Sequence, residues 1–398
     1  MEDRRLFKAW EKVYKERGWN EIAPYAKKAA LNEPYIILKD KNIRDAEKRK
    51  TSWKKARPIA PQTKHPMRTL FGLTGRALSF LTNRCEGEHF VLNHGGELKN
   101  FLEDTSKELS HLGELDYATA DIEGCFPNMP KEAIKLGLRK QLKSIQQRFN
   151  TDAISVPTNR NKKCTLRNMP FRGWKRIPFE TLMDVIEFAL ENTLVKDIRD
   201  GQIWRQSVGI PMGDPHSPGM TVGTCAWMED EWMQTIDSKT KQYFRAKRYM
   251  DDVLYIYAKN DNWEYDRLWE NLCTECYLPP LKLEKGKDGT FLETSFAITN
   301  NQVETWLKND NKIGETKVTR YANIECYSTF EQKKQVLNNC LRKVHEMANN
   351  DKRLQQSAIQ KIAEFKNKKY PRRMLWTACT TLGVKTRNTT WFKVRKAI

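Results

Sequence analysis

Residues 248–258 (RYMDDVLYIYA) place two adjacent aspartates inside an otherwise apolar run of β-forming residues. Side chains alternate between the two faces of a strand, so Asp251 and Asp252 cannot both lie on one face of a regular extended strand. A tight turn between two strands removes this conflict, and the segment therefore predicts a hairpin with the aspartates at its turn. The alternative is an exposed Asp-Asp turn with no further role, because such pairs are common in turns.

Two crowded carboxylates repel each other unless a cation compensates their charge, and a divalent metal ion is the natural partner. A second alternating segment, YATADIEGCFPNMP, places Asp121 at the end of another strand-like run. Carboxylates from separate strands can hold two metal ions about 4 Å apart for phosphoryl transfer, which makes Asp121 a candidate third carboxylate. The alternatives are a strand-end or helix-capping role for Asp121 and a place in the core for Phe126.

Between these segments, residues 209–232 (GIPMGDPHSPGMTVGTCAWMEDEW) combine glycine and proline directly before a helical pattern. This composition marks a constrained loop whose backbone can approach a ligand closely. A helix N-terminus behind such a loop suits a phosphate group or a template strand. A simple Gly-Pro turn is the alternative.

The net charge of +20 is spread unevenly along the 398 residues. Residues 1–64 hold 18 Lys and Arg against 9 Asp and Glu, residues 311–398 hold 20 against 6, and the remainder has a net charge of −3. An excess of one sign at both ends suggests a polyanion held between them, most obviously nucleic acid, although a solvated charged surface is the alternative. The 39% hydrophobic content is sufficient for a core, which excludes a disordered basic tail.

No run of 18 apolar residues and no apolar leader segment occurs, so we expect no membrane partner and a location inside the cell. That location is the nucleus if the source is eukaryotic and the cytoplasm otherwise. Nine scattered cysteines, an odd number, fit reduced thiols better than a disulfide framework.

Periodicity predicts helices over residues 1–30, 68–81, 179–195, 219–235, 329–348 and 354–367. It predicts strands over residues 34–38 and 115–122, and a hairpin around Asp200-Gly201. The polar stretch of residues 146–163 is expected to form an exposed loop or insertion.

The order of these segments resembles that of reverse transcriptase motifs, in the sequence Arg57-Pro58-Ile59, Asp121 with Phe126, Gly213 with Ser217-Pro218, and Tyr249-Met250-Asp251-Asp252. The motifs IPMGDPHSP and DIEGCFPNMP resemble those of Penelope-like retroelements, the branch grouped with telomerase. The resemblance extends from about Tyr35 to Pro371. Asp214 and His216 depart from the small or apolar residues of that branch. The GIY-YIG endonuclease motif of complete elements is absent after Pro371.

The resemblance implies an α+β right-hand polymerase with an antiparallel palm sheet flanked by helices and with a helical thumb. It implies an N-terminal helix and fingers in residues 1–110, a palm in residues 111–300 with an insertion near residues 140–180, and a thumb with a basic C-terminal tail in residues 301–398. The implied activity is RNA-directed DNA synthesis, in which dNTPs extend a primer 3′-hydroxyl on an RNA template by two-metal-ion chemistry.

The implied partners are an RNA template, a DNA or RNA primer, dNTPs and a separate nuclease. One alternative is a viral RNA-dependent RNA polymerase, although such enzymes carry Gly-Asp-Asp at the turn and a second Asp where Phe126 stands. The other is a polymerase fold that serves only as a nucleic-acid-binding scaffold.

The resemblance also implies roles for individual residues. Two Mg²⁺ ions, with Mn²⁺ as the alternative, would be held by Asp121, Asp251, Asp252 and the carbonyl of Ile122. The incoming nucleotide would contact Lys39, Arg57, Phe126, Met212, Gly213 and Lys282. Template and primer would contact Ser217, Pro218, Tyr249, Met250, Lys333, Lys334, Arg342 and Lys343. Lys54 and Lys55 compete for the phosphate role, and Lys285 and Lys287 compete with Lys282.

Overall fold

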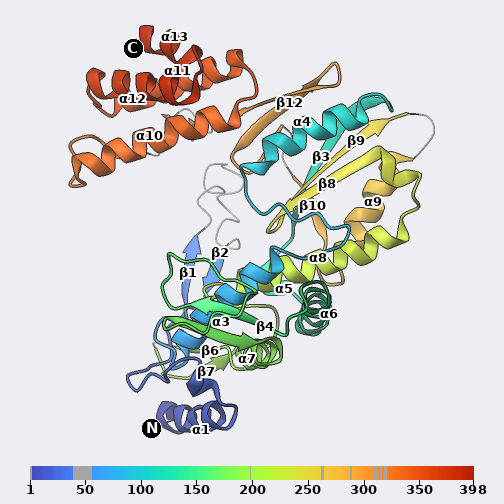
Figure 1. Ribbon diagram of the computed structural model, residues 1–398, viewed down its shortest axis with the longest axis vertical. Coiled ribbons are helices and arrows are strands. Elements are labelled where there is room, and N and C mark those ends of the chain that lie inside the picture. The colour runs from blue at the N-terminus through green and yellow to red at the C-terminus, as the bar shows by residue number, and fades with distance from the viewer. Residues whose placement is uncertain are drawn as a thin grey trace. The chain divides into compact units, whose positions relative to one another are not determined.

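The computed structural model describes residues 2–38, 56–197, 199–260, 264–286, 289–308, 312–313, 316–317 and 321–398. Helices combine with antiparallel strand pairs, which confirms the predicted mixture of helices and sheets (Figure 1). The chain forms two units, each assembled from segments distant in sequence. The first contains Met1–Val91, Asp121–Asp237 and Asp266–Glu284, and the second contains Leu92–Ala120, Ser238–Tyr265 and Lys285–Ile398.

The first unit is mainly helical. Its helices are α1 (Glu2–Glu16), α3 (Arg68–Thr82), α5 (Cys125–Asn128), α6 (Lys131–Phe149), α7 (Phe179–Glu191), α8 (Ser217–Thr235) and most of α9 (Tyr265–Glu275). Three antiparallel pairs accompany them: β1 (Tyr35–Leu38) with β2 (Ala56–Ile59), β4 (Ala153–Pro157) with β5 (Trp174–Pro178), and β6 (Leu194–Lys196) with β7 (Ile203–Arg205). Helices α3 and α8 lie at its centre, and both are buried over most of their length.

The larger sheet has the strand order β10 (Leu283–Lys285), β3 (Glu114–Ile122), β9 (Asp252–Lys259) and β8 (Phe244–Tyr249), and most of β3 with all of β8 and β9 belongs to the second unit. A three-stranded sheet follows with the order β11 (Thr290–Phe291), β12 (Thr294–Thr299) and β13 (Gln302–Leu307). Leucines of α4 (Glu97–Leu109) pack against Leu254 and Ile256 of β9 in one apolar core. Residues 253–258 of β9 are all buried, so both faces of this strand are covered.

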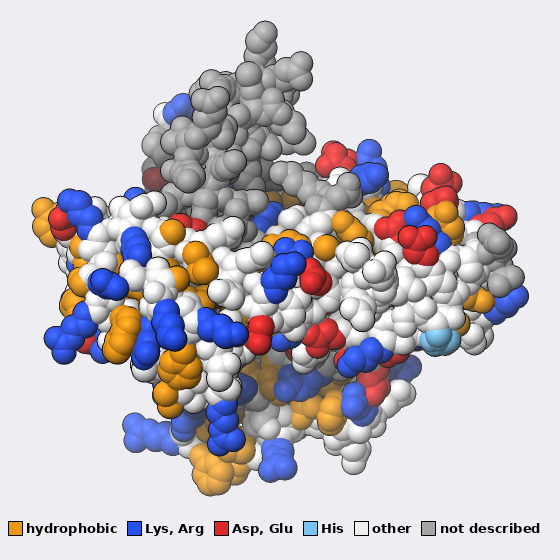
Figure 2. Space-filling view, turned by 90° about the horizontal axis from the view of Figure 1, so that it is seen from above, with side chains coloured by type: hydrophobic (Ala, Val, Ile, Leu, Met, Phe, Trp, Pro, Cys, Tyr) orange, Lys and Arg blue, Asp and Glu red, His pale blue; other side chains and the backbone are white. Residues whose placement is uncertain are grey.

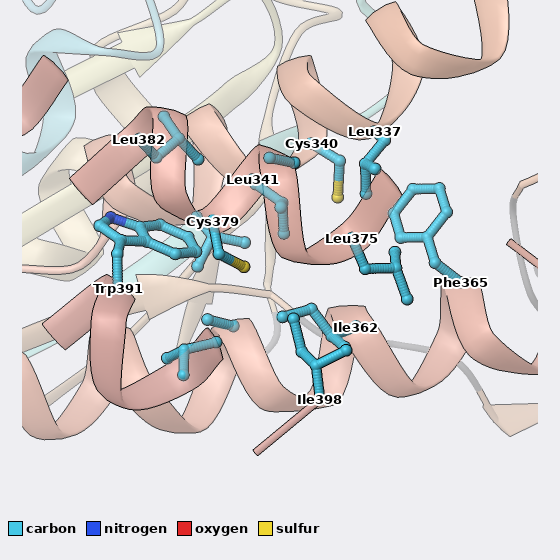
Figure 3. Close-up of a cluster of buried hydrophobic side chains, with 14 of the residues drawn as sticks. Leu337, Cys340, Leu341, Ile362, Phe365, Leu375, Cys379, Leu382, Trp391 and Ile398 are labelled. Atoms are coloured by element: carbon cyan, nitrogen blue, oxygen red, sulfur yellow. The ribbon is translucent and has the colours of Figure 1, made fainter. Parts of the chain in front are cut away.

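Four further helices of the second unit share a core of their own (Figure 3). They are α10 (Phe330–Met347), α11 (Asp351–Asn367), α12 (Arg372–Thr386) and α13 (Thr390–Lys396). Leu341, Leu375 and Trp391 are fully buried at its centre. Helix α10 begins with a capping box in which Thr329 and Gln332 satisfy each other's backbone amides.

Several stretches differ from the predicted elements. The first helix ends at Glu16, because Gly18 turns the backbone into the left-handed region with φ of 67°. Residues 146–163 are not one exposed loop, because α6 extends to Phe149 and β4 is a fully buried strand. The apolar run of β4 is short and is flanked in the sequence by polar residues, which led to the prediction of a loop. Helices α4, α9, α12 and α13 have no counterpart in the predicted elements.

Two predictions about chain class can be compared with the described residues. All nine cysteines are free thiols, as predicted. Across the described ranges, no helix combines the length and the apolar composition that crossing a membrane requires.

Candidate functional site

The two adjacent aspartates lie at a two-residue hairpin turn, as predicted. Tyr249 pairs with Asp252, which leaves Met250 and Asp251 as the turn between β8 and β9. Met250 has a φ of 58°, a left-handed conformation that non-glycine residues rarely adopt. Strained backbone of this kind tends to persist at functional sites, where surrounding structure enforces it. Asp251 and Asp252 are both partly exposed.

Arg248 supports this turn from inside the second unit, a role that was not predicted from the sequence. Its side chain is 1% exposed, and its guanidinium donates to the carbonyl of Met250 over 2.8 Å. The Arg248 carbonyl accepts a hydrogen bond from the amide of Leu92. The alternation of side chains along the strand could have indicated its burial, because Phe244, Ala246 and Arg248 share the buried face of β8.

Asp121 is the penultimate residue of β3, the strand that neighbours β9 in the sheet. Ile122 after it is fully buried, whereas Asp121 is partly exposed. Gly124 then turns the chain with φ of 56° into the short helix α5, which carries Phe126. Phe126 is also partly exposed, so its ring is not a closed core residue.

The segment Ile210–Met212 is fixed by backbone hydrogen bonds at both ends. The amide of Ile210 donates to the carbonyl of Phe126 over 2.8 Å, and the amide of Ala60 donates to the carbonyl of Met212 over 2.9 Å. Gly213 follows with φ of 116°, and a Cβ there would lie 3.2 Å from the Ala60 carbonyl oxygen. The backbone conformation therefore favours glycine, and the close approach of a second chain segment leaves little room for a side chain.

Behind this loop, Asp214 and His216 form a buried network, which explains the two departures from the expected motif. Oδ1 of Asp214 lies 2.7 Å from Nδ1 of His216, and Nε2 of His216 lies 2.7 Å from Oγ1 of Thr74 in α3. Both side chains are nearly fully buried, so they shape the loop from within. Ser217 is buried too, and its hydroxyl donates to the carbonyl of Pro211 over 2.6 Å.

The electrostatics of this network favour an ionised aspartate. Burial alone would raise the pKa of Asp214, but the charge and hydrogen bonds of His216 outweigh it and hold that pKa below its usual value. His65 lies near enough to interact with Asp214, yet its own burial lowers the pKa of His65 to about 4. His65 is therefore neutral at physiological pH.

Only some of the residues predicted to contact phosphates lie within the described ranges. Arg57 is exposed on β2, where it pairs with Ile37 of β1. Lys39, Lys54 and Lys55 lie outside the described residues. The side chain of Lys282 is mostly exposed, and its Nζ lies 3.4 Å from Oε2 of Glu123. The backbone amide of Glu123 donates to the backbone carbonyl of Lys282. Lys287 also lies outside the described residues.

The four basic residues predicted to contact duplex lie on α10. Lys and Arg side chains gather on the left of the face that Figure 2 shows. Lys334 and Arg342 are exposed and form ion pairs within the helix, with Glu331 and Glu346. Lys343 pairs with Glu293. Lys333 is buried, and its ammonium donates to the carbonyl of Cys326 over 2.7 Å, so its charge does not face solvent.

Carboxylate and carbonyl oxygens are the ligands that Mg²⁺ and Mn²⁺ prefer, so the chemistry of Asp121, Asp251 and Asp252 suits either ion. Within the described ranges, no group of three or more His, Cys, Asp or Glu side chains is gathered closely enough to hold a metal ion. The proposed ligand set therefore depends on the motif positions and on the order of the strands.

Comparisons with known proteins concern the fold. No family model and no curated protein matches the chain. The structure is similar to telomerase from Candida albicans in complex with a TWJ fragment of telomeric RNA, with a TM-score of 0.57, 12% identity and coverage of 97% of this chain and 65% of that one. Apo telomerase from Candida tropicalis gives a TM-score of 0.46 at 16% identity, over 96% of this chain and 67% of that chain. The Candida albicans likeness shows that this chain shares the fold of that telomerase, and the chain spans less than two thirds of its length.

Proposed function

We propose that this chain is an RNA-directed DNA polymerase that extends a primer 3′-hydroxyl with dNTPs. The observation that carries the proposal is the Tyr249–Asp252 turn. It holds Asp251 in a strained two-residue loop directly before β9, and β9 neighbours β3, whose penultimate residue is Asp121. The polymerase fold supports the same activity. RNA as template is supported by the likeness to a telomerase that was solved with an RNA fragment.

The fold likeness and the motif order together support a right-hand architecture of fingers, palm and thumb. In this proposal the basic N-terminal segments act as fingers, the sheet with β3, β8 and β9 as palm, and α10–α13 as thumb. The residues of the motifs IPMGDPHSP and DIEGCFPNMP further support a Penelope-like type, with any nuclease activity supplied by a separate protein.

In the proposed reaction, the primer 3′-oxygen attacks the α-phosphorus of the dNTP, and the bond to the pyrophosphate oxygen breaks in line. Bound Mg²⁺ ions would supply charge stabilisation for the attacking and leaving oxygens. Asp121, Asp251 and Asp252, with the carbonyl of Ile122, would hold those ions. The chain's other residues would bind the nucleotide, orient it and transfer protons.

Arg57 is the candidate clamp for the β- and γ-phosphates, because a guanidinium offers paired donors to phosphate oxygens. Lys282 would donate a proton to the departing pyrophosphate. Its ion pair with Glu123 is mostly exposed, so exchange of that partner for a phosphate costs little. Met212 and Gly213 would contact the incoming nucleotide, and Tyr249 and Met250 the primer end.

Phe126 is proposed to exclude ribonucleotides by contact between its ring and a 2′-hydroxyl. Its partial exposure on α5 is compatible with contact to a sugar. This assignment favours DNA as the product and separates the proposal from a viral RNA polymerase.

The test is primer extension on poly(rA)/oligo(dT) with Mg²⁺, comparing dNTPs with NTPs. We expect extension with dNTPs and none with Asp251→Asn, a substitution that keeps the shape of the side chain but removes its charge. Asp104→Asn, at an exposed position of α4, is the matched control and should retain full activity. Extension with NTPs alone would favour the RNA polymerase, and template binding without any extension would favour the scaffold.

A further inference from the structure

A cleft in the first unit lies between helix α3 and the loop that joins β4 to β5. Its volume is about 290 Å³. Helix α3 contributes Gly72, Arg76 and Phe80, and the loop contributes Lys162 and Lys163. Pro215, from the loop that follows Gly213, closes one side, so the cleft adjoins the segment proposed above to face the template.

The walls of this cleft are held in place by hydrogen bonds between α3 and the β4–β5 loop. The guanidinium of Arg76 donates to the carbonyls of Pro157 and Lys162 over 2.7 and 3.2 Å. The thiol of Cys164 donates to the carbonyl of Arg76, and the backbones of Ser155 and Thr165 exchange two hydrogen bonds. The cleft is therefore formed before any ligand arrives, which lowers the entropy cost of binding.

The charge around the cleft is of one sign. Residues 153–179 contain seven Lys and Arg and no Asp or Glu. Arg76 directs its charge to backbone carbonyls, and Lys162 and Lys163 are exposed without an ion pair to any residue in the described ranges. Among the seven, Arg176 pairs with Asp152. Unneutralised cations on a preformed wall favour a polyanion.

The floor of the cleft is apolar and carries an aromatic ring. Phe80 is partly exposed, and the guanidinium carbon of Arg84 lies 3.5 Å from the centre of its ring. Gly72 and Pro215 add further apolar surface. Unpaired bases stack on aromatic rings and guanidinium planes, whereas paired bases are hidden in the duplex. The combination suits a base on the floor and phosphates at the lysine rim.

We propose that this cleft binds an unpaired strand of nucleic acid. The identity of that strand as the single-stranded template ahead of the duplex rests on the proposed function. Under the proposed roles the duplex contacts lie on α10, so the cleft should contribute to affinity only when an unpaired extension is present.

Gly72 provides a steric probe of this proposal. A Cβ at Gly72 would meet no atom within 4 Å, whereas a Cβ at Gly75, one turn along, would lie 2.5 Å from the carbonyl oxygen of Pro215. The Cβ of Gly72→Leu therefore enters open space, and we expect the rest of the side chain to occupy the cleft. The substitution also replaces a glycine in a helix interior by a better helix former, so the fold is not expected to weaken.

The experiment measures fluorescence anisotropy of labelled primer duplexes with and without a single-stranded 5′ RNA extension. We expect the full chain to bind the extended duplex about tenfold more tightly, a gain typical of stacking one base. Gly72→Leu and the double variant Lys162→Glu/Lys163→Glu should lose this preference but keep their affinity for the blunt duplex. The double variant should also lower the salt slope for the extended duplex by about 1.4, as expected for two lost single-strand phosphate contacts.

Two controls accompany these variants. Gly72→Ala leaves most of the cleft open and should keep the preference. Lys27→Glu/Lys28→Glu reverses two adjacent exposed charges in the same unit and should also keep it.

The proposal is overturned if both test variants retain the preference, or if they weaken blunt and extended duplexes equally. It is supported if the preference alone is lost, even when the wild-type chain extends no primer. That last result would contradict the proposed function and leave the cleft as a strand-binding site.

Discussion

The two loops that carry the principal motif residues are built in opposite ways. The turn at Met250 and Asp251 is set by the pairing of its flanking strands, with one buried arginine behind it. The loop at Gly213 does not lie between two paired strands. It depends instead on the buried network of Asp214 and His216, which reaches Thr74 of α3. Local pairing thus fixes the first loop, and tertiary contacts fix the second.

The largest expected effect concerns the buried network. Asp214→Ala removes an ionised carboxylate, leaves His216 without its partner, and should lower the free energy of unfolding by about 4 kcal/mol. Urea denaturation at pH 7 measures this loss. Asp251→Ala, at the partly exposed turn, should change the same quantity by less than about 1 kcal/mol. Equal losses in the two variants would contradict the contrast between the loops.

A pH dependence should accompany the same network. Because burial lowers the pKa of His65 from 6.5 to about 4, the unfolded chain binds a proton between these values that the folded chain does not. The free energy of unfolding should therefore rise by about 3 kcal/mol in total as the pH increases from 4 to 6.5. Above pH 6.5 His65 should add nothing further.

Urea midpoints over this pH range, compared between the wild type and His65→Phe, isolate the contribution of His65. The phenylalanine keeps the aromatic packing against Phe71, which stacks on His65 at 4.7 Å. The variant should show the shallower slope, and parallel curves would refute the assignment.

The smallest expected effect lies at the hairpin. Met250→Gly relieves a left-handed φ that costs an L-residue roughly 1–2 kcal/mol, so it should stabilise the chain by about 0.5–1 kcal/mol after the extra entropy of glycine is counted. Lys247→Gly, within β8, should instead destabilise it by a similar amount. Thermal denaturation of both variants provides the comparison, and a loss of stability in Met250→Gly would show that its side chain matters more than its backbone.

The same contrast explains how far the sequence predicts this molecule. The turn at Asp251 follows from alternation over a few residues, and helices α3 and α8 follow from periodicity and the glycine-proline start. Strand β4 was missed because five buried residues are too few to outweigh polar neighbours. The inward orientation of Asp214 and Ser217, and the burial of Lys333, depend on partners that no local pattern reveals.

The segment Ile210–Met212 couples two parts of the first unit mechanically. Its backbone is tied to Phe126 at one end and to Ala60 at the other, with Gly209 pressed against the carbonyl of Pro127. We therefore expect a shift of any one of these backbones to move the others. Under the proposed roles, closure around a sugar at Phe126 and movement of the strand that carries Arg57 occur as one displacement, so a poorly fitting sugar would also loosen the grip on the phosphates.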